Sequence, residues 1–343
     1  WIRNHIKYIF INIIFGIMVY FMMISENLVN SHDGIWNTSS FIAGSWEASL
    51  GRGLLHYIDE IRAGIVSVPL NTVLTLLIVS VASVLIIDFL AIESRKLGVL
   101  VSLLLIANPV TCDTLSYCFT SVGYGMAFLF SVLSVGCICG KSRIVGILLG
   151  AVFLALSLSC YQAYFGITCL LLLLQVMKML LDCERGKRIV EFLIKGILAI
   201  VIGGIFYSLI SDALLKKYGI ELAPYRGASE VSVGRIIALL PESMQLCYKE
   251  FYNFFVKNRM GITVFNETVI LIGGMGVLLS VCVFRHFFVI WRISRGHALC
   301  FLACICLVPV GCNAVVLLVS SDMDTLMSMG MVASVALVSA VIL

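Results

Sequence analysis

The chain has 343 residues, of which 61% are hydrophobic and 12% charged, and its formal net charge is +4. So few charged groups cannot cover the surface of a water-soluble protein of this size, and lipid must cover most of the exterior. Apolar runs of roughly 17–25 residues, long enough to cross a hydrocarbon core of about 30 Å, recur between short charged clusters. Because these runs are continuously apolar, they favour helices over strands, and we predict an all-α, polytopic membrane protein.

About ten segments are predicted to span the membrane, within a single membrane domain that covers residues 1–343. In chain order they are approximately Lys7–Ile24, Ile65–Ala91, Leu97–Val110, Tyr117–Cys139, Ile144–Leu158, Ala163–Leu181, Val190–Leu214, Ile262–Phe284, Leu299–Val319 and Leu326–Leu343.

The distribution of basic residues predicts the orientation of these spans. Twelve basic residues, among them Arg95, Lys141 and Arg285, fall on one side of the membrane, and three connections on the opposite side carry no Lys or Arg. The positive-inside rule therefore places the N-terminus in the cytoplasm. Two long segments, about residues 25–64 and 215–261, then lie outside.

The cysteines and histidines do not form a recognisable metal site. Most of the 13 cysteines lie within apolar spans, where they are expected to be small buried hydrophobic residues. The five histidines are scattered, and no phosphate loop, dinucleotide-binding turn or nucleophile elbow is present. We therefore expect no cofactor, although a divalent metal ion stays open.

The first external segment contains the candidate catalytic carboxylate. Asp33 follows the first span after a few residues, so it lies near the outer membrane interface. A solvated turn aspartate beside Gly34 is the alternative reading.

An interfacial helix is predicted further along the same segment. Its apolar stripe consists of Trp46, Leu50, Leu54, Tyr57 and Ile61. Arg52, His56 and Asp59 share another face of such a helix. A carboxylate and an arginine at the outer interface suit glycosyl transfer from a lipid-phosphate sugar: the carboxylate takes the acceptor proton, and the arginine binds the leaving phosphate. The alternative for Arg52 is a snorkelling interfacial residue.

Three sequence blocks resemble the multi-spanning, phage- or island-encoded glucosyltransferases that modify bacterial O-antigen, which belong to the C-type superfamily of lipid-phosphate-dependent glycosyltransferases. The blocks are Asp33 with Trp46 and Gly51-Arg52; Asn108-Pro109 with Leu115-Ser116-Tyr117-Cys118-Phe119-Thr120-Ser121; and Ser159-Cys160-Tyr161-Gln162-Ala163-Tyr164. The chain departs from the family pattern in two places: His32-Asp33 stands for an acidic pair, and Thr120 stands for an aspartate.

The resemblance implies a fold like that superfamily and an inverting transfer of glucose from undecaprenyl-phosphate glucose to O-antigen or a related glycan. The reaction is expected on the periplasmic face of the bacterial inner membrane, with no nucleic acid as partner. For catalysis we predict Asp33 and Glu47, and for the donor phosphate Arg52, His56 and Arg226. For the sugar and acceptor we predict Trp36, Trp46, Asn108, Tyr117, Tyr161 and Gln162.

Several alternatives remain open at this point. Tyr161 is otherwise an interface anchor, and the second long external segment, which carries Arg226, is otherwise a cap over the membrane domain. An O-antigen polymerase or ligase would rely on arginines such as Arg226 and Arg235. A transporter of lipid-linked glycans usually buries ionisable residues at mid-membrane, whereas Asp88 and Lys195 fall near predicted span ends. A non-catalytic scaffold is the last alternative, which the ordered motifs disfavour.

Overall fold

The computed structural model describes residues 2–31, 35, 39–224, 232–257, 266–319 and 321–342. Three predicted site residues, Asp33, Trp36 and Arg226, lie outside these ranges. The structure is 81% helical and has no strand in the part that it describes, where Ser40 and Ile65 form an isolated antiparallel bridge. The predicted all-α class is confirmed.

Seven helical segments within the described ranges are long and apolar enough to cross a membrane. They are α6 (Val68–Phe89), α9 (Ser121–Cys139), α10 (Arg143–Cys160), the segment Gln162–Leu181, α12 (Gly186–Tyr218), the Gly276–Ile293 part of α14 (Asn266–Ile293) and α15 (Arg295–Cys312). Gln162–Leu181 consists of the 3-10 helix η1 (Gln162–Tyr164) and α11 (Phe165–Leu181). These seven segments give the chain the character of a membrane protein.

The remaining described elements are shorter, bent or more polar. They are α1 (Ile2–Val19), α2 (Phe21–Ser25), α4 (Ser45–Ser49), α5 (Leu54–Ile61), α7 (Arg95–Ile106), α8 (Pro109–Ser116), α13 (Val233–Tyr252), the π-helix η3 (Asn253–Lys257), α16 (Val316–Val319), the 3-10 helix η4 (Thr325–Met327) and α17 (Met329–Ile342). The helices α7 and α8 give an eighth span if they are counted together. The predicted count of about ten spans and the likeness to the C-type superfamily fold stay predictions.

The bend between α7 and α8 follows from local sequence. The two helices meet at 41°. Proline at position 109 disfavours helical geometry in the residue before it, so Asn108 is extended, with φ −151° and ψ 161°. The Asn108 side chain then caps α8, because its Oδ1 accepts a 2.9 Å hydrogen bond from the Thr111 N–H.

Buried hydroxyl groups join the helices at the centre of the bundle. On α9, Ser131 Oγ lies 2.8 Å from Ser157 Oγ of α10, and the Ser157 hydroxyl donates to the Ala127 carbonyl. Nearby, Ser134 donates to the Gly150 carbonyl over 2.8 Å. Small residues and interhelical hydrogen bonds of this kind let apolar helices approach closely in lipid, where hydrophobic burial does not drive association.

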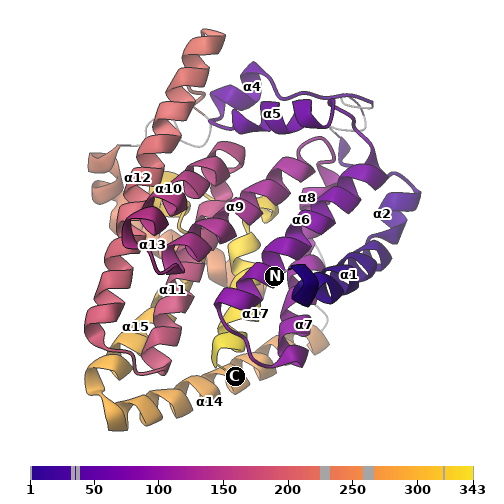
Figure 1. The fold of residues 1–343 in the computed structure, drawn as a ribbon. Coiled ribbons are helices and arrows are strands. Elements are labelled where there is room, and N and C mark those ends of the chain that lie inside the picture. Colours follow the sequence, from indigo (N-terminus) through magenta and orange to yellow (C-terminus); the bar gives the residue numbers. More distant parts are fainter. Residues whose placement is uncertain are drawn as a thin grey trace.

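Two short helices close one end of the bundle. Figure 1 shows α4 and α5 lying across the upper ends of α6, α9 and α10, while α12 extends beyond them. We call this the capped end. At the opposite end, α14 runs across the bundle at a steep angle to α11 and α15 (Figure 1). The sequence predicts the capped end to be the external one.

Candidate functional site

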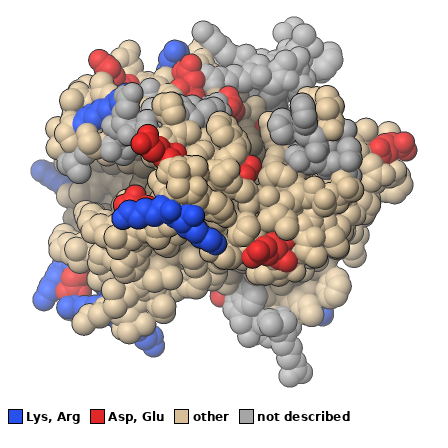
Figure 2. Space-filling view, turned by 90° about the horizontal axis from the view of Figure 1, so that it is seen from above, with Lys and Arg blue, Asp and Glu red and all other residues tan. Residues whose placement is uncertain are grey.

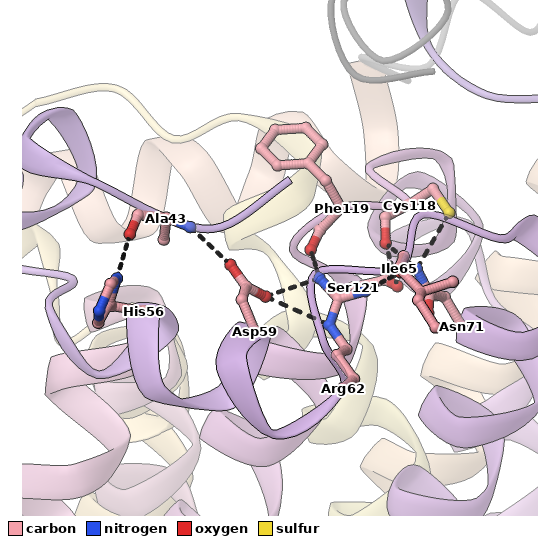
Figure 3. Close-up of polar contacts among 9 residues, drawn as sticks. All are labelled: Ala43, His56, Asp59, Arg62, Ile65, Asn71, Cys118, Phe119 and Ser121. Carbon is pink, nitrogen blue, oxygen red and sulfur yellow. Dashed lines mark hydrogen bonds and ion pairs between the residues drawn. The ribbon is translucent and has the colours of Figure 1, made fainter. Parts of the chain in front are cut away.

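A buried ion pair ties the segment that carries α4 and α5 to the α8–α9 turn (Figure 3). Arg62 Nη2 lies 2.6 Å from Asp59 Oδ1, and the two side chains are only 7% and 3% exposed. The Asp59 Oδ2 accepts a 2.9 Å hydrogen bond from the Ala43 N–H, and the Arg62 guanidinium also donates to the Phe119 carbonyl. Burial raises the pKa of the Asp59 carboxyl, while the hydrogen bonds from Arg62 and Ala43 oppose that shift.

Two further contacts hold the same segment in place. Asn71 Nδ2 donates to the Cys118 carbonyl over 2.9 Å (Figure 3). His56 Nδ1 lies 2.7 Å from the Ala43 carbonyl oxygen, and its Nε2 lies 3.3 Å from Glu60 Oε1. His56 and Asp59 are therefore occupied by contacts within the segment, and they do not share a face with Arg52.

The predicted interfacial helix is divided into two, and the break turns Arg52 inward. The helix α4 ends at Ser49 and α5 begins at Leu54, with Gly51 between them at φ +74°. Only glycine adopts this left-handed conformation without strain. A Cβ atom at Gly51 would also collide with the Tyr207 hydroxyl and the Gln162 amide. The close approach at Gly51 therefore brings Arg52 to the wall of a cavity.

This cavity has a volume of about 480 Å³ and lies beneath the α4–α5 segment. Its polar lining residues are Arg52, Tyr117, Tyr124, Tyr161, Gln162, Tyr207, Ser208, Ser211, Asp212 and Asp324. The rest of the wall consists of leucine, valine and methionine residues, namely Leu50, Leu215, Leu222, Val315, Leu318, Val319, Leu326 and Met327. Figure 2 looks onto the capped end and shows acidic and basic residues scattered over a surface that is mostly neither.

Aromatic rings fix the position of the arginine at the cavity wall. The Arg52 guanidinium carbon lies 4.6 Å from the centre of the Tyr161 ring, and Nη1 donates to the Tyr124 hydroxyl over 3.3 Å. The Tyr124 and Tyr161 rings are themselves stacked, with centroids 4.3 Å apart. Cation–π contact and stacking restrict the plane of the guanidinium, so its N–H groups point in defined directions.

The Gln162 side chain holds the loop between α4 and α5, which carries Arg52, in place. Gln162 Nε2 donates to the Leu50 carbonyl over 2.7 Å and lies 2.9 Å from the Tyr207 hydroxyl. Tyr161 is extended, with φ −162°, so α10 ends there and the short helix η1 begins at Gln162. This break in the helical bundle directs both side chains into the cavity.

Two carboxylates line the cavity, Asp212 and Asp324. On α12, Tyr207 and Ser211, and likewise Ser208 and Asp212, are four residues apart and share one helix face. Asp324 precedes η4, in the connection between α16 and α17. Sequence reasoning missed these residues. The polar face of α12 in an otherwise apolar run was the signal for Asp212.

The cavity brings together four of the predicted site residues, namely Arg52, Tyr117, Tyr161 and Gln162. The other four that the structure describes do not line it. Trp46 is 61% exposed on α4, and Glu47 accepts a 2.8 Å hydrogen bond from the Gly44 N–H, as an N-terminal cap of that helix. His56 and Asn108 make the structural contacts described above. The roles assigned to all of these residues stay predictions.

A separate apolar groove of about 690 Å³ lies between α11, α12 and α15. Its walls include Leu172, Leu193, Gly196, Ile200 and Leu307. The helix α12 lines both spaces: residues 186–200 face the groove, and residues 207–215 face the cavity. Within the described ranges, no group of three or more His, Cys, Asp or Glu side chains is placed to hold a metal ion.

The three motif blocks of the sequence converge on this one cavity, since Arg52, Tyr117 and Tyr161 come from different blocks. The family model described as Glucosyl transferase GtrII matches residues 21–340. The chain belongs to this family. It is therefore a glucosyltransferase, as the resemblance implies, which favours group transfer over the transporter and scaffold alternatives. Neither the curated proteins nor the solved structures compared with the chain gave a match.

Proposed function

We propose that this glucosyltransferase transfers glucose from undecaprenyl-phosphate glucose to O-antigen or a related surface glycan, with inversion at the anomeric carbon. The observation that carries the proposal is the convergence of three separate motif blocks around the Arg52 guanidinium in one cavity. A sugar donor and a glycan acceptor follow from the family, and the lipid-phosphate part of the donor rests on the site.

Arg52 is the proposed ligand of the donor phosphate. A guanidinium binds phosphate oxygens through two parallel hydrogen bonds, and this requires that its plane be fixed. Stacking on Tyr161 and the hydrogen bond to Tyr124 supply that constraint. The same positive charge stabilises the phosphate as it leaves, because the leaving group gains one negative charge when its bond to glucose breaks.

The apolar groove supports a lipid-linked donor over a soluble nucleotide sugar. Its lining is almost entirely hydrocarbon, and it follows α12 away from the cavity. An isoprenoid chain in this groove contacts apolar side chains, and α12 leads from the groove, at Ile200, to the cavity, at Tyr207. The two spaces thus match the two chemical halves of a polyprenyl-phosphate sugar.

The proposed reaction is a single displacement at the anomeric carbon. The acceptor hydroxyl oxygen attacks carbon 1 of glucose, the bond from that carbon to the phosphate oxygen breaks, and a carboxylate takes the hydroxyl proton. The sequence predicts Asp33 for this role, with Glu47 as the second catalytic residue. No cofactor enters this scheme. We further propose that the N-terminus is cytoplasmic and that the capped end faces the periplasm of an inner membrane.

The test is glucose transfer by the purified protein from radiolabelled undecaprenyl-phosphate glucose to O-antigen polysaccharide. We expect Arg52→Ala to lower kcat/KM by about 10²-fold or more, the scale of losing a charge-assisted contact in a shielded site. Arg52→Lys keeps the charge without the planar fork and recovers only part of the loss. Arg143→Ala, which removes a 70% exposed arginine of a surface ion pair, is the control with unchanged transfer. Equal kcat/KM in Arg52→Ala and Arg143→Ala rejects the phosphate site.

A further inference from the structure

A carboxylate other than the one predicted from the sequence lies on the cavity wall. Asp324 lines the cavity together with Leu326 and Met327, its neighbours in the α16–α17 connection. Its backbone is fixed, because its carbonyl accepts hydrogen bonds from the Met327 N–H, over 3.0 Å, and from the Ser328 hydroxyl, over 2.9 Å. These hydrogen bonds fix the start of η4, where Asp324 lines the cavity.

A second carboxylate lies behind Asp324. Asp113 is on α8, outside the seven long spans, and α8 packs against η4. The negative charge of Asp324 acts on the Asp113 carboxyl. Burial and that neighbouring charge raise the pKa of Asp113. The packing of α8 on η4 thus places a second acidic residue close to the one that lines the cavity.

We propose that Asp324, rather than Asp33, is the general base of glucosyl transfer. This inference rests on the proposed function. Arg52 and Asp324 then have complementary roles in one displacement: the Arg52 cation binds the leaving phosphate, and the Asp324 carboxylate accepts the proton of the attacking hydroxyl. Asp212 lies on the α12 wall with Ser208 and Ser211, a set of acceptors and donors suited to sugar hydroxyls.

The proposed step balances in atoms and charge. The acceptor O–H proton moves to an Asp324 oxygen while the acceptor oxygen bonds to carbon 1 of glucose. The electron pair of the broken carbon–oxygen bond stays on the polyprenyl phosphate, whose charge becomes one unit more negative. The protonated Asp324 carboxyl releases its proton to water after the product leaves, and no oxidant or metal ion is required.

The test compares two near-isosteric substitutions in the same connection. Asp324→Asn removes the carboxylate from the cavity, whereas Asp322→Asn makes the same charge change at a residue that is also exposed but does not line the cavity. We measure transfer from undecaprenyl-phosphate [14C]glucose to O-antigen polysaccharide and, separately, equilibrium binding of that donor. A general base contributes about 10²–10⁴-fold to the rate. We therefore expect Asp324→Asn to lose at least 100-fold in kcat and to bind donor within about twofold of wild type, while Asp322→Asn keeps wild-type kcat.

The pH profile separates catalysis from structure. Because a general base acts only when it is deprotonated, the wild-type kcat should fall on the acidic side of its pH profile, and Asp324→Asn should lack this acidic limb. Asp212 is the other carboxylate that lines the cavity, and the same profile in Asp212→Asn is the control. That substitution should raise KM and leave the acidic limb in place.

Three results would overturn the assignment of the base, and a fourth would overturn the proposed function. Asp324→Asn with more than one tenth of wild-type kcat overturns the inference, as does loss of turnover in Asp33→Asn with retained turnover in Asp324→Asn. Loss of donor binding in Asp324→Asn, equal to its loss of transfer, also overturns it. If the wild-type protein transfers no glucose from this donor, the proposed donor itself is wrong.

Discussion

The buried pair of Asp59 and Arg62 gives the most direct prediction about the segment that holds Arg52 over the cavity. Asp59→Asn keeps the shape of the side chain and the acceptor for the Ala43 N–H, but it leaves the Arg62 charge buried without its counter-ion. Breaking a buried pair in this way costs about 3–5 kcal/mol. At about 1.4 kcal/mol per tenfold, opening of the segment should become roughly 100- to 5000-fold more frequent.

Hydrogen–deuterium exchange of backbone amides over residues 43–65 measures this opening. The matched control is Glu191→Gln, which breaks the exposed Arg143–Glu191 pair, with side chains 70% and 36% exposed, and should cost less than about 1 kcal/mol. The double variant Asp59→Asn with Arg62→Met removes both charges and should recover part of the loss. Exchange in Asp59→Asn that matches Glu191→Gln would refute the reasoning.

Three further substitutions test the cavity and the groove. Gly51→Ala forces an L residue to φ +74° against Tyr207, so the free energy of unfolding should fall by at least about 1–2 kcal/mol and glucose transfer should decrease. Gly44→Ala is the control, because a Cβ atom added there contacts nothing, and it should stay near wild type. Tyr161→Leu removes the cation–π contact and should weaken donor binding about 3- to 30-fold in a titration, while Tyr161→Phe keeps the ring and the affinity. Gly196→Phe fills the apolar groove and should raise KM for a long-chain donor relative to a farnesyl-phosphate sugar, whereas Gly204→Phe, which faces open space, should not.

Composition and apolar run length were sufficient for the all-α class and for most of the long helices. The end of the short span Leu97–Val110 was also predictable, because the proline after Asn108 takes that residue out of helical geometry, but the separate helix α8 that follows it was not. The helical spacing from Trp46 to Ile61 predicted one helix. The positive φ at Gly51 divides it, and periodicity of apolar residues carries no information about that angle.

The cavity was only partly predictable. Motif resemblance selected Arg52, Tyr117, Tyr161 and Gln162, which come together although they are far apart in sequence. It could not select Asp324, because that residue reaches the cavity through the packing of η4 on α8. For His56 the sequence predicted too much. Its spacing from Arg52 suggested that both residues share one helix face, but the helix is broken at Gly51, so this spacing does not apply.

The most direct test of a lipid-phosphate donor is a comparison of two radiolabelled glucose donors with the purified protein in lipid nanodiscs. We predict transfer to O-antigen polysaccharide from undecaprenyl-phosphate [14C]glucose, with no transfer above background from UDP-[14C]glucose, and loss of the lipid-dependent signal in Arg52→Ala. Equal transfer from the nucleotide sugar, or a lipid-dependent signal unchanged by Arg52→Ala, would contradict the account.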